Sequence, residues 1–388
     1  MRFFALGLLA FAIIVLLHFM TSSPTAQDSQ PLETAEEKKS LPLPDRLQRL
    51  VSRIRANKKL VGLAAVIMVD GKVIASAADG ERKIGSGIPL EVGDKFHIGS
   101  ITKSITATML ARLIERDILS WDTTVGDVFG DSLELHADWK NVTLQQLLTH
   151  TSGAPANFPF TSQLQHPPEG AERIKARLTF VAAVLKQKPS KLLGTAFVYS
   201  NVGPSIAGAM TEKLTGESWE DLIRQEVFVP LELAHAGFGP PQDNEAEFDQ
   251  PRGHRLFLGS KQAVGLSDDN TPIIGPAGIV HMTLTELCTF GNEHRLGEKG
   301  NGKLLKAESY TRLHTPVLNN YAWGWVVPDK ANWTDARFYW HNGSNTMWYA
   351  LLVVLPEQNA VVAVAANDGD IPKAEAGAFQ IVSELFGN

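Results

Sequence analysis

Strand-like segments near both ends of the chain, separated by a long helix-rich stretch, constrain the fold more than any other feature of the sequence. Residues 63–69 and 73–78 are short apolar runs around Asp70-Gly71, a pair that favours a two-residue hairpin turn. Residues 347–355 and 360–365 form a second pair around a Pro-Glu-Gln-Asn turn. We therefore predict one sheet that is assembled from distant parts of the chain.

The stretch between these strands has helical rather than strand periodicity. A long helical pattern without Pro or Gly begins after Gly99. The expected fold is α/β of the α+β type: a central antiparallel sheet flanked by helices, with a mainly helical second subdomain. The sheet subdomain comprises residues 45–120 and 276–388, and the helical subdomain comprises residues 121–275. Helical patterns occupy residues 45–58, 143–149, 173–186, 205–214, 219–228 and 374–386, and residues 323–327 add a further strand.

Composition excludes several classes of function. The 388 residues are 44% hydrophobic and 20% charged, which is typical of a globular protein with a full core. The net charge is -6 without a basic run, so nucleic acid is not an expected partner. The only cysteine, Cys288, is interpreted as a small buried residue. None of the 11 histidines has metal-ligand spacing, so neither a metal nor a cofactor is expected.

The N-terminus has the charge order of an export signal. Arg2 precedes an apolar run over residues 3–17, and no further basic residue follows until Lys38, which predicts a cytoplasmic N-terminus with the rest of the chain outside. Residues 1–20 are therefore predicted to be a signal peptide or an N-terminal membrane anchor, and cleavage is left open. We expect residues 21–44 to be a disordered tether and residues 45–388 to form the domain. The expected location is periplasmic or extracytoplasmic, either soluble or attached to the inner membrane through residues 3–20.

Ser100-Ile101-Thr102-Lys103 places a serine and a lysine three residues apart at the start of the long helical pattern. Residues i and i+3 share a helix face, so Lys103 is expected beside Ser100. A desolvated lysine has a lowered pKa and can take the proton of the serine hydroxyl, which makes the serine a nucleophile. About one such match is expected by chance in a chain of this length, and the alternative is a capping serine followed by a solvated lysine.

Two further elements follow at fitting separations. Tyr199-Ser200-Asn201 precedes a helical stretch; its tyrosine can relay a proton, and its asparagine amide can hold a substrate carbonyl, although an isolated motif of this kind is more often a half-buried loop. A basic residue followed by x-Gly occurs at His235 and at His341. The second, His341-Asn342-Gly343-Ser344, leads into a strong strand. Its Ser344 amide, together with that of Ser100, would make an oxyanion hole in which each donor contributes about 3 kcal/mol.

In this order, the S-x-x-K, Y-S-N and H-x-G elements resemble those of the serine β-lactamase and penicillin-binding-protein superfamily, on the class C side. Its members include β-lactamases, D-alanyl-D-alanine peptidases and esterases. Leu-Leu-Thr-His150-Thr-Ser-Gly, Gly275-Pro-Ala-Gly278 and Tyr321-Ala-Trp-Gly-Trp325 also resemble stretches of this family. The similarity covers nearly everything after the tether.

The resemblance implies Ser100 as nucleophile, Lys103 and Tyr199 as the acid-base pair, and Asn201 and His341 to Ser344 as substrate-binding residues. Class C β-lactamases usually have Lys-Thr-Gly at the third element, where this chain has His341 and Asn342. A largely neutral imidazole holds a carboxylate less well, which favours a peptidase or esterase over an efficient β-lactamase. The expected partner is a small-molecule or peptide substrate, with peptidoglycan-derived peptides among the candidates. The alternative is a module that binds penicillin or wall fragments without turnover, and the oligomeric state is left open.

Overall fold

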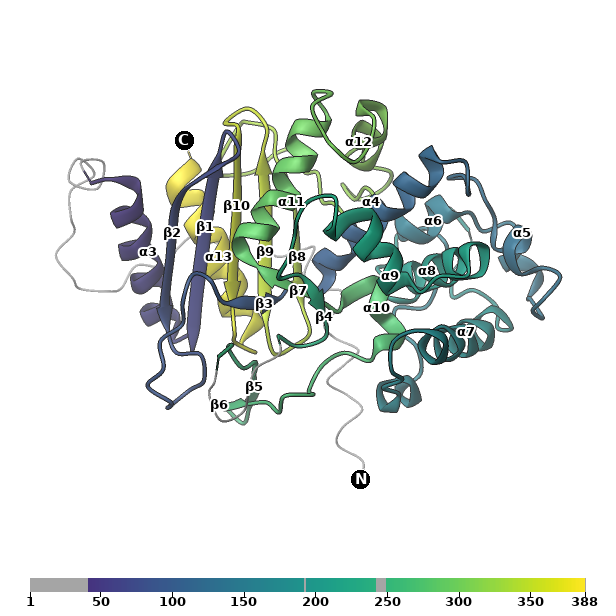
Figure 1. The fold of residues 1–388 in the computed structure, drawn as a ribbon, viewed down its shortest axis with the longest axis horizontal. Helices are drawn as coiled ribbons and strands as arrows, with labels where there is room; N and C mark the ends of the chain where they lie inside the picture. The colour runs from purple at the N-terminus through teal and green to yellow at the C-terminus, as the bar shows by residue number, and fades with distance from the viewer. Residues whose placement is uncertain (1–40, 192, 242–248, 388) are drawn as a thin grey trace. The chain divides into compact units, whose positions relative to one another are not determined.

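A five-stranded antiparallel sheet joins the two ends of the domain (Figure 1). The structure, which is a computed structural model, describes residues 41–191, 193–241 and 249–387. Asp70 and Gly71 form the predicted hairpin turn, with φ angles of 48° and 75° that suit a two-residue turn between twisted strands. In spatial order, the strands are β2 (Lys72–Gly80), β1 (Gly62–Val69), β10 (Ala360–Ala366), β9 (Tyr349–Leu355) and β8 (Tyr339–Ser344).

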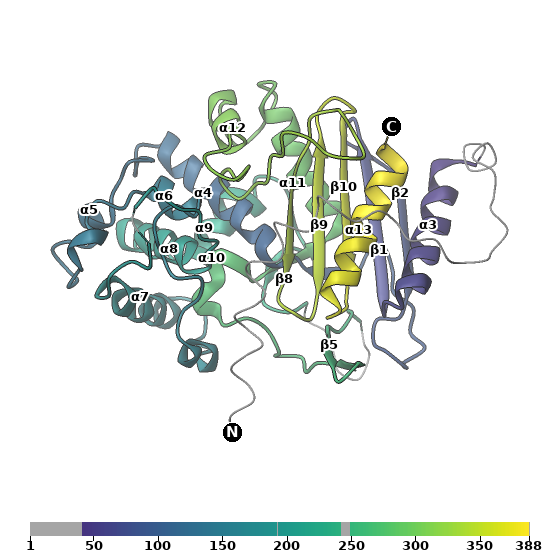
Figure 2. The ribbon, with the colours of Figure 1, turned by 180° about the vertical axis from the view of Figure 1, so that it is seen from behind.

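Side chains alternate between the two faces of this sheet, and each face packs against helices. In β1, Ala64 and Val66 belong to a core cluster that contains residues of α11 (Leu284–Gly297), whereas Leu63 and Ala65 belong to a cluster with the terminal helices. Figure 1 shows α11 on one face, and Figure 2 shows α3 (Leu43–Lys58) and α13 (Ile371–Phe386) on the other. The predicted antiparallel sheet flanked by helices is confirmed.

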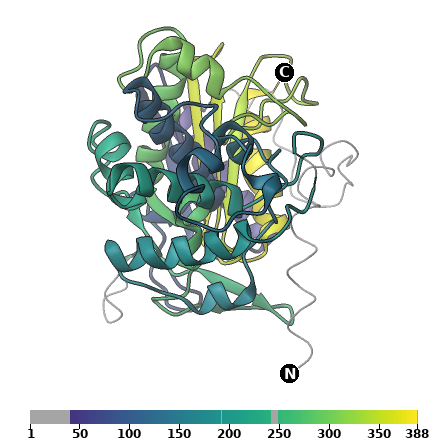
Figure 3. The same ribbon diagram turned by 90° about the vertical axis from the view of Figure 1, so that its right-hand side faces the viewer.

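A helical layer packs beside α11 and the β8 edge of the sheet (Figure 3). Its central helix, α4 (Thr102–Glu115), is buried along almost its whole length. In the chain α4 comes soon after β3, the first strand of a three-stranded sheet in the order β3-β7-β4. The remaining elements are α5 (Val125–Phe129), α6 (Leu144–Leu148), α7 (Ala171–Leu185), α8 (Val202–Thr215), α9 (Trp219–Ile223), α10 (Gly275–Gly278), α12 (Ala307–Leu313), β3 (Lys95–His97), β4 (Gly237–Phe238), β5 (His254–Phe257), β6 (Ser260–Ala263), β7 (Val280–Thr283), the 3₁₀ turns η2 (Gly99–Ile101), η3 (Ala137–Trp139), η4 (Phe160–Leu164) and η6 (Pro272–Ile274), and a π-helical turn, η5 (Arg224–Phe228).

Two strand predictions near the C-terminal end are wrong in position. Residues 323–327 form a loop with isolated bridges rather than a strand, because Gly324 has a φ angle of 78° and its backbone packs against that of Ser104 in α4. The third motif does not begin the strand over residues 347–355. It lies in a separate edge strand, β8, which a short turn connects to β9.

The N-terminal predictions fall mostly outside the described residues. The signal or anchor at residues 1–20 and most of the tether over residues 21–44 lie there, so these stay predictions. Helix α3 begins at Leu43, two residues before the expected start of the domain. Among the described helices, none combines the length and the apolarity that a bilayer crossing needs.

Candidate active site

Ser100 lies in the 3₁₀ turn η2, immediately before α4. The strand before it, β3, pairs with β7, and this pairing continues through the hydrogen bond from the Ile98 amide to the Val280 carbonyl at 2.9 Å. Gly99 then reverses the chain with a φ angle of 51°. A side chain at Gly99 would collide with the backbone of Gly343 and Ser344, so glycine is required for both conformation and space. Ser100 is left half-buried at the N-terminal end of α4.

Lys103 lies beside Ser100, as their spacing predicts. Its Nζ atom is 3.0 Å from Ser100 Oγ, 2.8 Å from Asn201 Oδ1 and 2.9 Å from the Ala277 carbonyl oxygen. Only 3% of Lys103 is exposed, and this burial holds its pKa well below the ordinary value for a lysine. A neutral amine has two protons for the two carbonyl oxygens and one lone pair for the Ser100 proton. The geometry therefore suits a lysine that acts as a base.

Tyr199 approaches the same pair from the segment before α8. Its hydroxyl forms a hydrogen bond with Ser100, and Lys103 Nζ lies 4.8 Å from the centre of its ring. Burial raises the pKa of Tyr199, and the bond to Ser100 opposes that rise only in part. A neutral phenol at this position can donate and accept a proton, which suits a relay more than a permanent base.

Asn201 is the N-cap residue of α8. Its Oδ1 atom accepts the hydrogen bond from Lys103, and its Nδ2 atom donates to Asn157 Oδ1 at 2.7 Å. The Asn201 backbone amide is fixed by the Ala156 carbonyl at 2.8 Å. The Asn201 side chain thus orients Lys103 through Oδ1, while its Nδ2 group points toward the exposed Asn157.

Gly343 and Ser344 bring the edge of the large sheet to the nucleophile. A side chain at Gly343 would collide with the Ile98 carbonyl and the Ser100 amide, so the two backbones are in direct contact. The Trp340 amide donates outward from the sheet to the Val326 carbonyl at 2.9 Å. Amides two residues apart point to the same side of an antiparallel strand, so the Ser344 amide also points outward, toward Gly99 and Ser100. The backbone amides of Ser100 and Ser344 therefore lie at the same contact between η2 and β8.

The His341 side chain lies on the face of β8 that is turned toward Lys103, but it has no free N–H to offer a substrate. Its Nδ1 atom donates to the Asn342 carbonyl, and its Nε2 atom accepts a hydrogen bond from the Tyr321 hydroxyl at 3.2 Å. The residue is 2% exposed, and burial, reinforced by the charge of Lys103, lowers the pKa of His341 to about 3. The alternative third motif at His235 does not join this group, because His235 is bound to Glu286.

The Asn342 side chain lies away from the other predicted residues. Trp340 and Asn342 point to the face of β8 that α13 covers, where Trp340 packs against Phe379 and Asn342 Nδ2 donates to Glu375 Oε1 at 2.9 Å. Alternation along the strand therefore separates Asn342 from His341. The sequence predicted that Asn342 would bind the substrate, but its side chain lies on the face of β8 that is turned away from Ser100.

Sequence reasoning assigned no role to two further aromatic residues of the site. His150, 1% exposed, has a φ angle of 61° and accepts a hydrogen bond from the Ser200 amide at 3.2 Å through Nδ1. Its ring centre lies 4.5 Å from that of Tyr199 and 4.7 Å from that of Tyr321. The sequence stretches that contain His150 and Tyr321 resemble those of the family. Only the structure shows that the His150 ring packs against Tyr199 and that the Tyr321 hydroxyl bonds to His341.

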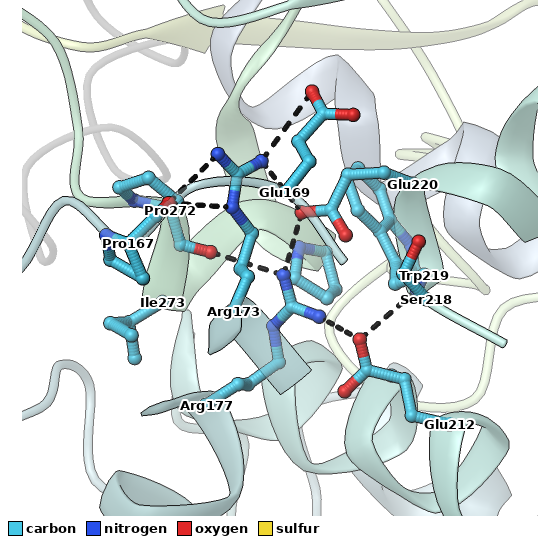
Figure 4. Close-up of polar contacts among 12 residues, drawn as sticks. Pro167, Glu169, Arg173, Arg177, Glu212, Ser218, Trp219, Glu220, Pro272 and Ile273 are labelled. Carbon is cyan, nitrogen blue, oxygen red and sulfur yellow. Dashed lines mark hydrogen bonds and ion pairs between the residues drawn. The ribbon is translucent and has the colours of Figure 1, made fainter. Parts of the chain in front are cut away.

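A buried ion cluster supports the segment that supplies the Ala277 carbonyl (Figure 4). Arg177, fully buried in α7, is paired with Glu212 of α8 and with Glu220 of α9. The same guanidinium donates to the Pro272 carbonyl at 3.1 Å, just before α10. Three helices are thereby tied to the segment that contacts Lys103.

Comparisons with known proteins identify relatives along most of the chain and structures of similar fold. Penicillin-binding protein 4 of Amycolatopsis lactamdurans is 27% identical over 336 residues, which are 83% of this chain and 84% of that protein. A solved class C β-lactamase has a TM-score of 0.69 at 20% identity and covers 89% of this chain and 98% of its own. The D-amino acid amidase of Ochrobactrum anthropi SV3 has a TM-score of 0.68 at 18% identity, with coverages of 87% and 99%. At these identities the two structures show a shared fold.

The match to a whole family extends over most of the domain. Residues 47–385 match the family described as Beta-lactamase, from the first buried turn of α3 to the end of α13. This range contains all three motifs and both halves of the large sheet. The chain belongs to the beta-lactamase family.

Proposed function

We propose that the protein is a serine acyl-hydrolase that forms a covalent acyl-enzyme on Ser100 with amide or ester substrates. The observation that carries this proposal is the position of Lys103, whose buried amine forms hydrogen bonds with Ser100 Oγ and with two neutral carbonyl oxygens. A serine hydroxyl becomes a useful nucleophile when a neighbouring base accepts its proton. Family membership supports the same chemistry.

Acylation would begin when Lys103 Nζ takes the proton of Ser100 Oγ. The oxygen then forms a bond to the substrate carbonyl carbon, and the carbonyl oxygen becomes an anion held by the amides of Ser100 and Ser344. The bond to the leaving nitrogen or oxygen breaks as that atom receives a proton through Tyr199, which Lys103 in turn reprotonates. The net change is transfer of the acyl group to Ser100 and of one proton to the leaving group.

Deacylation would run through the same groups with water in place of the leaving group. Water gives a proton to the Lys103 and Tyr199 pair while its oxygen attacks the ester carbonyl. The bond to Ser100 Oγ then breaks, and Ser100 recovers its proton as the acid product leaves. The closeness of Tyr199 to both Ser100 and Lys103 supports this shared use.

The third motif favours substrates without a carboxylate beside the scissile bond. Both ring nitrogens of His341 are engaged, and the residue is neutral, so it supplies neither a charge nor a free N–H. The Asn342 side chain lies on the opposite face of the strand. We therefore place neutral esters and amides, including those of D-amino acids, ahead of β-lactams and of peptides with a free C-terminus.

Acyl transfer is tested with the full-length protein, a fluorescent penicillin and a p-nitrophenyl ester. The proposal predicts labelling or ester turnover that Ser100→Ala abolishes and that Ser104→Ala, a serine one helical turn further on, retains. Ester hydrolysis that persists in Ser100→Ala would contradict the assignment. Stoichiometric acylation without turnover of any ester or amide would instead support a binding module.

Substrate class is tested with a matched pair, N-acetyl-D-alanyl-D-alanine and its C-terminal amide. The two compounds differ only in the carboxylate that a cationic third motif would bind. We expect kcat/KM to be higher for the amide. A clear preference for the free carboxylate would contradict the proposed selectivity while leaving acyl transfer intact.

A further inference from the structure

Asp269 lies in the loop between β6 and η6, outside the motifs that define the family resemblance. Its side chain is only 5% exposed, and its Oδ1 atom meets two partners from different parts of the fold. Asn345 Nδ2 donates to this oxygen at 2.8 Å, and His97 Nε2 lies 3.0 Å from the same oxygen. Both partners are themselves buried, so Asp269 links two elements inside the protein.

The His97 contact leads to the nucleophile. The Gly99 amide donates to His97 Nδ1 at 3.1 Å, so Nδ1 supplies a lone pair and the ring proton lies on Nε2, which faces the Asp269 carboxylate. His97 is fully buried in β3, and Gly99 is the residue before Ser100. A continuous set of polar contacts therefore runs from Asp269 to the turn that presents the Ser100 amide.

The Asn345 contact leads to the other half of the oxyanion hole. Asn345 follows Ser344 directly, at the start of the turn from β8 to β9. Its Oδ1 atom accepts a hydrogen bond from the Met347 amide at 3.2 Å, while its Nδ2 atom is the group that donates to Asp269. Both polar atoms of the Asn345 side chain are thus held in hydrogen bonds, next to the Ser344 amide in the chain.

The neighbouring residue extends the same arrangement to Lys103. Asn270 Nδ2 donates to the Gly278 carbonyl at 2.8 Å, and Gly278 follows Ala277, whose carbonyl accepts the hydrogen bond from Lys103. The Asp269-Asn270 pair consequently contacts three of the segments around the site. These are β3 before the Ser100 turn, the residue that follows β8, and α10.

We propose that Asp269 is a positioning residue that holds the amides of Ser100 and Ser344 in register through His97 and Asn345. This inference rests on the proposed acyl-transfer function of Ser100. Negative charge develops on the substrate carbonyl oxygen only as the transition state forms, so misplaced donors weaken the transition state more than the bound substrate. A displacement of about 1 Å at such a site costs about 100-fold in rate.

Three variants of the full-length protein test the role of Asp269. Asp269→Ala removes both contacts and should lower kcat/KM for the ester by about 10-fold to 100-fold, mainly through kcat. Asp269→Asn keeps an acceptor for Asn345 but removes the charge that faces His97, so its loss should be smaller. Asp268→Ala is the matched control, because the Asp268 carboxylate caps the Gly265 amide within the same loop at 2.8 Å. It should stay within about twofold of wild type.

A double-mutant cycle separates positioning from general loss of stability. Because Asn345→Ala breaks one of the two contacts that Asp269→Ala already removes, the double variant should cost little more activity than Asp269→Ala alone. The affinity for phenylboronic acid, whose adduct with Ser100 places an oxygen in the oxyanion hole, should fall in parallel with kcat/KM. Additive losses, a change in KM alone, or an effect no larger than that of Asp268→Ala would overturn the proposal.

Hydrogen-deuterium exchange gives a readout that does not depend on catalysis. The Gly99 amide is bonded to His97, so Asp269→Ala should accelerate exchange in peptides that contain Gly99 and Asn345, whereas Asp268→Ala should not. Unchanged exchange in both peptides would overturn the positioning role. Absence of acylation in the wild type, with altered exchange in Asp269→Ala, would instead contradict the function of Ser100 and leave the structural link in place.

Discussion

The amine of Lys103 lies 3.0 Å from the hydroxyl oxygen of Ser100, and its two other hydrogen bonds go to the neutral oxygens of Asn201 and Ala277. Burial without a carboxylate among these partners disfavours the charged amine. The pair is therefore arranged so that the proton can move from serine to lysine. The pH dependence of acylation follows from this relationship.

The pH dependence of acylation should follow the lowered pKa of Lys103. Only the neutral amine accepts the Ser100 proton, so kcat/KM should rise with pH through the lysine pKa and reach its plateau well below the ordinary value of 10.5. Lys103→Met should lower kcat/KM by about 100-fold to 10,000-fold. The exposed Lys140 provides a control, and Lys140→Met should leave the profile unchanged. An acid limb near pH 10 in the wild type would contradict the proposed base.

Selectivity between a free carboxylate and its amide should change when a cation is introduced into the third motif. In His341→Lys, an ammonium group faces the site in place of a neutral ring whose nitrogens are both engaged. The ratio of kcat/KM for N-acetyl-D-alanyl-D-alanine over its amide should rise by about 10-fold to 100-fold, since a charged hydrogen bond contributes about 1.5–3 kcal/mol. His341→Gln, which remains neutral, is the control. An equal rise in both variants would show that charge is not the determinant.

Removal of the buried charge of Arg177 should lower the free energy of unfolding more than removal of an exposed arginine charge. Arg177→Ala leaves Glu212 and Glu220 buried without this cation, which should lower the free energy of unfolding by about 3–5 kcal/mol. Arg224→Ala breaks two ion pairs that are largely exposed and should cost less than about 1 kcal/mol. Urea denaturation measures both. Similar losses in the two variants would argue against a structural role for the cluster in Figure 4.

Stability should fall as pH rises through the titration of Glu375. Burial raises the pKa of Glu375 to about 7 from 4.5, so the folded state binds a proton more tightly than the unfolded state. The stabilisation is complete below pH 4.5 and is lost as pH approaches 7. Glu375→Gln keeps an acceptor for Asn342 and should remove this dependence, so that the variant has the higher melting temperature at pH 8. Equal melting temperatures at pH 8, or parallel pH profiles, would contradict this assignment.

The sequence predicted local relationships better than distant ones. Ser100 and Lys103 are three residues apart on one helical turn, and Asp70-Gly71 lies between two strands, so the spacing itself determines their geometry. The strands at both chain ends were sufficient to predict a shared antiparallel sheet, because each had one or two apolar faces to bury.

Long-range contacts account for the features that the sequence did not reveal. Whether His341 or Asn342 faces the site depends on where β8 begins, and that strand was not distinguished from the following one. The pairing of Tyr321 with His341 joins a loop to a strand, and Asp269 meets His97 and Asn345 from a third segment. No periodicity connects these residues, because only the packed fold brings them together.

The central claim is that Ser100 forms the acyl-enzyme, and intact-protein mass spectrometry with peptide mapping tests it most directly. The full-length protein is incubated with a penicillin or a rapidly acylating ester, quenched in acid and digested. The account predicts one added acyl group, located on the peptide that contains Ser100 and absent from Ser100→Ala. An adduct on another residue, or one that persists in Ser100→Ala, would contradict it.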